Sequence, residues 1–122
     1  MSRDDADRVA DIFGAIEAIN VAESVMTSHD GDDRLKAVCI DAITYRVFTI
    51  GEATKELSPG AKDAHPDVPW SNIAKMRDLI GHHYYRRDLE IIFATIREPL
   101  TQLRTACEQI AVAARDQADT GN

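Results

Sequence analysis

Apolar residues recur at spacings of three, four and seven along most of this chain, and this period decides which folds are open to it. The pattern is clear in the first segment, whose apolar positions are Val9, Ile12, Phe13, Ile16, Ile19 and Met26. Such spacing gathers apolar side chains on one face of an α-helix, and it predicts an amphipathic helix over residues 4–27. The sequence has no two-residue alternation and no hairpin signal, so we expect an all-α fold.

A second helix is predicted over residues 32–57, after a turn whose aspartates can cap it. It carries two apolar rows, Leu35, Val38, Ala42 and Tyr45 in one and Ile43, Val47, Ile50 and Leu57 in the other. Two rows predict burial on two sides, either at the centre of a bundle or also against a second subunit. Gly51 costs about 1 kcal/mol of helix propensity, which indicates close approach of another backbone. Glu52 is either a buried partner for an arginine or a surface glutamate.

The rest of the chain completes a bundle. Prolines and a glycine make residues 58–69 a loop with a short helical turn near residues 61–64, and a third long helix is predicted from about residue 70 to Gly81. His83 to Arg87 then form a polar, aromatic connection. The last helix begins near Asp88, and Pro99 predicts a kink or break within residues 96–99. We expect a four- to five-helix up-and-down bundle over residues 1–115 and a frayed tail over residues 116–122.

Length and composition agree with a single folded domain. The chain has 122 residues and an apolar content of 44%. This length is enough to bury one core and too short for two. Cys39 and Cys107 each lie inside an apolar helical pattern and are expected to be reduced core residues. No segment approaches the roughly 20 apolar residues of a membrane span. The start of the chain is acidic where a signal peptide would be basic, so we expect a cytoplasmic protein.

Charge is unevenly distributed along the chain. The net charge of −7 argues against a general nucleic-acid binder. The segment over residues 75–88 nevertheless holds four basic side chains and two histidines against two aspartates. The basic residues are Lys75, Arg77, Arg86 and Arg87, the histidines are His82 and His83, and the aspartates are Asp78 and Asp88. This segment is either a solvated helix end or a local cluster of positive charge on an otherwise acidic protein. The second interpretation predicts a selective phosphate site.

The segment Arg77-Asp78-Leu79-Ile80-Gly81-His82-His83-Tyr84 holds the groups best suited to chemistry. An arginine is a permanent cation with a planar fork that suits phosphate, and a histidine exchanges protons near neutral pH. Residues five apart on a straight helix lie roughly 140° apart around its axis. We therefore expect Gly81 to end the helix and let His82 turn toward the side of Arg77.

One arginine and one histidine make only half of a ribonuclease site. Cleavage by the ribose 2′-hydroxyl needs a base, an acid for the 5′-oxygen and a cation on the phosphorane. An isologous dimer would bring two copies of this segment around one groove. Two other interpretations stay open: an aromatic cap over the bundle with His82 bonded to a carbonyl, and a metal site made of His82 and His83. The chain has no Gly-rich phosphate loop, which argues against its acting on ATP by itself.

Trp70 through Tyr84 resembles the Arg-x4-His-x-Tyr signature of HEPN-domain toxins of the HepT type. Ile50-Gly51-Glu52-Ala53 and Asp88-Leu89-Glu90 are similar to further segments of that family, and the likeness spans roughly residues 5–112. It implies a HEPN-like bundle and a metal-independent ribonuclease, without cofactor, assembled as a homodimer. Arg77 and His82 would be catalytic. Asp78, at a position that is often asparagine, and His83 would support them.

The resemblance also implies a partner and a control. In the family, an MntA-type nucleotidyltransferase antitoxin adds AMP to the motif tyrosine, which falls on Tyr84 here, with Tyr85 as the neighbouring alternative. The added phosphate and base would block the site beside Arg77 and His82. We therefore expect the toxin of a type VII toxin–antitoxin system that cleaves mRNA or tRNA. The alternative is a non-catalytic HEPN interaction module that only docks the nucleotidyltransferase.

Overall fold

The computed structural model describes the backbone of residues 3–84 and 89–120 and the side chains of residues 5–76, 78, 93–94 and 96–117. Those residues form helices and no strand. The helices are α1 (Arg3–Ser28), α2 (Asp33–Glu56), α3 (Pro59–Asp63), α4 (Trp70–Tyr84) and α5 (Leu89–Thr120). The all-α prediction is confirmed.

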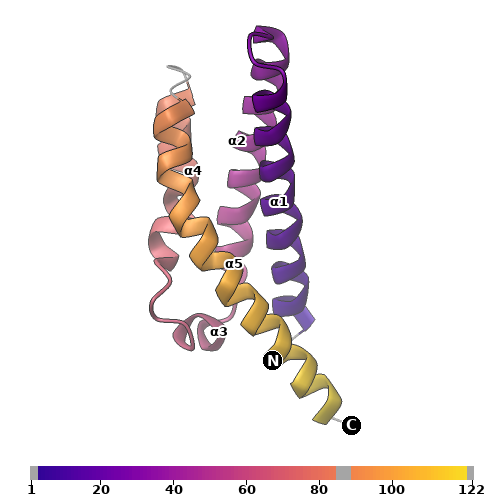
Figure 1. Cartoon of the computed structure of the whole chain (residues 1–122). Coiled ribbons are helices and arrows are strands. Elements are labelled where there is room, and N and C mark those ends of the chain that lie inside the picture. Colours follow the sequence, from indigo (N-terminus) through magenta and orange to yellow (C-terminus); the bar gives the residue numbers. More distant parts are fainter. Residues whose placement is uncertain (1–2, 85–88, 121–122) are drawn as a thin grey trace.

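The four long helices form an up-and-down bundle. α2 packs against both α1 and α4, and α5 packs against both α1 and α4, so the four enclose one core. Figure 1 shows the turn between α1 and α2 at the same end of the molecule as the end of α4 and the start of α5. The short α3 lies at the opposite end. The segment from Arg77 to Tyr84 therefore lies at the α1–α2 turn end of the bundle.

Local signals account for the α1–α2 turn. The carboxylate of Asp32 accepts a hydrogen bond from the backbone N–H of Leu35 at 3.0 Å, which caps α2 as the sequence predicts. Gly31 has a φ of 96°, a conformation that a glycine adopts without the steric penalty of a side chain. The turn is therefore set by three neighbouring residues and needs no distant contact.

Of the two apolar rows on α2, only one enters the core. Ile43, Val47, Ile50 and Leu57 are all buried, as predicted. Val38 and Tyr45 from the other row are 64% and 61% exposed, so the prediction that this row is buried within the bundle is wrong. Both α1 and α4 pack around the first row, and the opposite side of α2 faces solvent. Glu52 is partly buried.

The core also contains the two cysteines. Cys39 and Cys107 are buried and free, which confirms the sequence prediction. Burial raises the pKa of the Cys107 thiol from 9.0 to about 12, because the apolar surroundings penalise the thiolate. The protonated thiol therefore acts as a small apolar side chain within the contact between α5 and its neighbours.

The end of α4 differs from the sequence prediction. α4 continues through Gly81 to Tyr84, whereas its end was predicted at Gly81. α5 continues through Pro99, where a kink or break was predicted. A glycine costs only about 1 kcal/mol inside a helix, which packing against other helices can offset. Pro99 removes one backbone donor, yet Ile96 and Leu100 on either side are buried and hold the chain in place. Figure 1 shows α5 bent but unbroken.

Gly51 sets the distance between α2 and α4. A methyl group on Gly51 would lie 3.2 Å from the carbonyl oxygen of Ala74, closer than an ordinary van der Waals contact. A larger residue would push α4 outward or bend it. The close approach predicted from the sequence is confirmed, and its partner is the helix that carries Arg77 and His82.

Two glycine substitutions test this contact. Gly14 also lies inside a helix, but nothing lies within 4 Å of a methyl group placed there. We expect Gly14→Ala to raise the free energy of unfolding by about 0.5–1 kcal/mol through helix propensity. Gly51→Ala should lower the free energy of unfolding by about 1 kcal/mol, because overpacking against Ala74 outweighs the gain in helix propensity. Urea unfolding measures both, and equal gains at the two positions would contradict the close contact.

Candidate active site

The start of α4 is held by its own first residue. The indole Nε1 of Trp70 donates to the carbonyl oxygens of Lys62 at 3.1 Å and His65 at 3.0 Å. The backbone N–H of Ile73 donates to the carbonyl oxygen of Pro69 at 2.9 Å. Because one indole N–H contacts both the end of α3 and the loop after it, α4 begins at a defined place relative to that loop.

A buried carboxylate connects the same loop to α1. Asp5 is only 1% exposed, and its two oxygens accept from the backbone N–H of Ser58 at 2.9 Å and from the Ser58 hydroxyl at 2.6 Å. The Ser58 oxygen in turn accepts from the backbone N–H of Ala61 at 3.2 Å and caps α3. A buried carboxylate is costly unless it is hydrogen-bonded, and here both oxygens have a donor.

Further along α4, packing fixes which side of the helix faces α2. Ile73 and Met76 are buried in the core, and Ala74 contacts Gly51 of α2. Positions three and four residues after Ala74 lie on nearly the same side of a helix. Position 77 therefore also lies on the side of α4 that faces α2.

The predicted site residues fall on one continuous helix. Arg77, His82, His83 and Tyr84 all belong to α4, but their side chains lie outside the described residues. Asp78 is exposed. Tyr85 and residues 86–88 lie outside the described backbone. The basic cluster over residues 75–87 therefore stays a prediction, and so does the assignment of Tyr84 rather than Tyr85 as the modified tyrosine.

Continuity through Gly81 changes the expected geometry. Positions 77 and 82 lie roughly 140° apart around an unbroken α-helix, so one subunit does not present both on one side. Positions 77 and 84 are seven residues apart, close to two full turns, and lie on nearly the same side. The expectation that Gly81 ends the helix and frees His82 is therefore wrong.

One contact near this end of the bundle was not predicted from the sequence. Arg97 of α5 donates through Nη2 to Oε1 of Glu23 in α1 at 2.5 Å, and its guanidinium lies 5.6 Å from the ring centre of Phe93. These residues border a cavity of about 380 Å³ beside the α1–α2 turn. Glu23 and Arg97 are 74 positions apart, so no local pattern reveals the pair.

Comparison with known protein families shows which family this chain belongs to. The sequence profile of the family described as "Ribonuclease HepT-like" matches residues 15–110, which run from the middle of α1 through most of α5. This chain belongs to the HepT-like ribonuclease family. The match includes all of α4, and so it includes the Arg77–Tyr84 segment in which the sequence resemblance was recognised.

Individual relatives agree with the family. The HepT-like chain is 30% identical over 112 residues to "Probable ribonuclease HepT" of Thermococcus cleftensis, an alignment that covers 90% of this chain and 98% of the relative. It is 38% identical over 75 residues to "Putative RNase TTE0752" of Caldanaerobacter subterraneus subsp. tengcongensis, covering 57% and 67% of the two chains. No solved structure matches the chain. In the described part of the chain, no helix has the length and apolarity needed to cross a membrane.

Proposed function

We propose that this HepT-like chain is a metal-independent RNA endonuclease and the toxin of a type VII toxin–antitoxin system. The observation that carries the proposal is the occurrence of Arg77 and His82 on one helix, α4, in a member of a ribonuclease family. The arginine would stabilise the phosphorane, and the histidine would transfer the protons. Asp78 and His83 are proposed to support them.

The helix geometry supports a composite site. Because positions 77 and 82 lie roughly 140° apart on an unbroken helix, we propose that the pair works across a homodimer interface. Each groove would then combine groups from two copies of α4. An isologous dimer places the same surface of both subunits together, so each missing half would come from the partner.

Regulation is proposed to act on Tyr84. Its position is close to two turns after Arg77 and on nearly the same side of α4. AMP attached there by an MntA-type nucleotidyltransferase would place a negative phosphate near the arginine and exclude an mRNA or tRNA substrate.

A second candidate is a non-catalytic module that docks the same nucleotidyltransferase. The net charge of −7 favours it, because an acidic surface repels RNA. Cleavage of RNA by the purified protein would distinguish the two.

The catalytic pair is tested by substitution and mixing. Arg77→Ala and His82→Ala should each lower RNA cleavage by a factor on the order of 100 or more, with unchanged circular dichroism. Lys55→Ala is the control, since it removes an exposed cation from α2, outside the basic cluster. Mixing the two inactive variants should restore part of the activity if the pair is completed across the dimer. Full activity in either single variant would contradict the assignment.

Product chemistry tests the mechanism. The ribose 2′-hydroxyl would attack the adjacent phosphate and expel the 5′-oxygen, which takes a proton from the general acid. We therefore expect cleavage in EDTA to leave 2′,3′-cyclic phosphate and 5′-hydroxyl ends. Mass spectrometry of a short RNA substrate identifies these ends. Strict dependence on magnesium together with 5′-phosphate products would indicate another mechanism.

Tyr84 is tested by co-expression with the nucleotidyltransferase. Wild-type protein should gain the mass of AMP and lose RNA cleavage, whereas Tyr84→Phe should keep its activity and its unmodified mass. Tyr85→Phe is the matched control, because it removes a hydroxyl one residue away. If Tyr85→Phe alone abolishes the modification, Tyr85 is the acceptor. If neither variant changes the outcome, inhibition does not require modification of a tyrosine in this segment.

A further inference from the structure

A cavity at the α3 end of the bundle lies between α3 and α5. It has a volume of about 470 Å³. Alanines line it from both helices, with Ala61 and Ala64 at the α3 side and Ala113 and Ala114 on α5. Gly60 also lines the cavity, and a methyl group placed on it would meet nothing within 4 Å. Small side chains on both sides therefore leave a space that can hold a ligand.

The buried part of the cavity lining is apolar except for one carboxylate. Ile110 and Ala114 are buried, and so is Asp5, which is only 1% exposed. Ala113 and Gln117 line the same cavity and are exposed, so the cavity opens to solvent on their side. A ligand that enters past Gln117 would therefore meet apolar walls and a single negative charge.

The Asp5 carboxylate has hydrogen-bond donors but no cation beside it in the described part of the chain. Ser58 supplies both donors, its backbone N–H and its hydroxyl group. None of the ion pairs between described side chains includes Asp5, and no lysine or arginine is among the described residues that line the cavity. An ionised carboxylate has about four acceptor positions, so this one can accept further hydrogen bonds from a charged donor.

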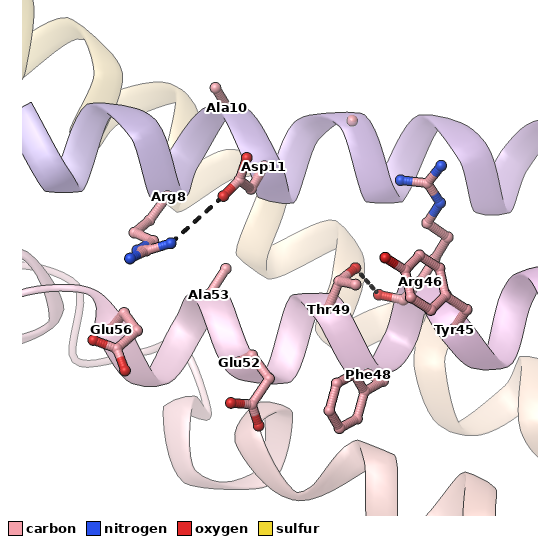
Figure 2. Close-up of a pocket in the computed structure, with 11 residues that line it drawn as sticks. Arg8, Ala10, Asp11, Tyr45, Arg46, Phe48, Thr49, Glu52, Ala53 and Glu56 are labelled. Carbon is pink, nitrogen blue, oxygen red and sulfur yellow. Dashed lines mark hydrogen bonds and ion pairs between the residues drawn. The ribbon is translucent and has the colours of Figure 1, made fainter.

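A larger hollow between α1 and α2 differs in its charges. It has a volume of about 720 Å³, and Arg8 and Asp11, which pair at 3.8 Å, line it together with Arg46 and Glu56 (Figure 2). Cations and carboxylates lie side by side there, so they offset one another and favour neither charge on a ligand. The cavity that contains Asp5 instead favours a cation.

The hydrogen bonds of Asp5 distinguish between two kinds of organic cation. A guanidinium group pairs best with a carboxylate when both oxygens are open to its two parallel N–H groups. Ser58 already donates to both Asp5 oxygens, at 2.9 Å and 2.6 Å, which leaves no open edge for that arrangement. An ammonium group is compact and needs only one free acceptor position on an oxygen. The geometry therefore favours an ammonium group.

We propose that the cavity between α3 and α5 binds a primary aliphatic amine, with the ammonium group at Asp5. The hydrocarbon chain lies against Ile110 and the alanines of the cavity, where it is removed from water. The side-chain oxygen of Gln117 at the opening can accept a hydrogen bond from a second ammonium group, so diamines and polyamines belong to the same ligand class. This amine site does not depend on the proposed ribonuclease activity.

Titration with two ligands of the same shape tests the charge preference. The backbone N–H of Ser58 donates to Asp5, so its NMR chemical shift reports on the carboxylate. Hexylamine should shift this signal until the site is saturated. Hexan-1-ol has the same chain without the charge, and it should bind at least about tenfold more weakly, the loss expected for one charge-assisted hydrogen bond. Equal affinities for the two ligands, or no saturable shift with hexylamine, would overturn the proposal.

Substitutions test where the amine binds. Asp5→Asn should weaken hexylamine binding by about tenfold or more, but it also removes a bond that holds Ser58 and so can lower stability. Ala113→Phe leaves Asp5 and Ser58 in place, and its ring should fill the opening and weaken binding by a similar factor. Val112→Phe is the matched control, because Val112 is the preceding residue of α5, is 47% exposed and does not line the cavity. Unchanged binding in Ala113→Phe would place the amine elsewhere on this acidic protein and overturn the proposal.

Thermal unfolding provides a second measurement that does not rely on NMR. A ligand that binds only the folded chain raises its melting temperature as the ligand concentration rises. Hexylamine should therefore raise the melting temperature of wild-type protein and Val112→Phe, and it should have a smaller effect on Ala113→Phe. Equal increases in all three proteins would overturn the proposal, since they would show that the stabilising amine binds outside the cavity. RNA cleavage enters neither measurement, so the amine site and the ribonuclease proposal can fail separately.

Discussion

The contact between Gly51 of α2 and the backbone at Ala74 of α4 is the constraint on which the rest of this structure depends. A side chain at position 51 would lie 3.2 Å from the Ala74 carbonyl oxygen, so glycine lets the two helices lie this close without crowding. The contact fixes where α4 lies along α2 and which side of α4, including position 77, faces α2. It also leaves the opposite side of α2 free, where Val38 and Tyr45 are exposed.

Two further interactions keep α4 in this place from its other end. The indole N–H of Trp70 contacts the loop before α4, and the buried Asp5 carboxylate ties Ser58 of the same loop to α1. Hydrogen bonds therefore anchor the start of α4, and core packing together with the Gly51 contact holds its middle. The Arg77–Tyr84 segment continues directly from this anchored part of α4.

Much of the fold and of the candidate site could be predicted from the sequence. Apolar periodicity identified the long helices, and Asp32 identified the start of α2, because both signals are local in the chain. The end of α4 was predicted wrongly at Gly81, since packing from distant segments outweighed a local helix-breaking preference. The Arg97–Glu23 pair joins residues 74 positions apart, and no local pattern indicates it.

By itself, the sequence determined that the chain is helical and which apolar residues could form its core, because helical period and side-chain type belong to neighbouring residues. Only the tertiary structure decided that the row containing Tyr45 faces solvent, since both apolar rows on α2 have the same local pattern. It also decided that α4 runs unbroken past Gly81, which places positions 77 and 82 on different sides of one helix. Burial and helix continuity depend on which helices pack together, and that is a property of the assembled bundle.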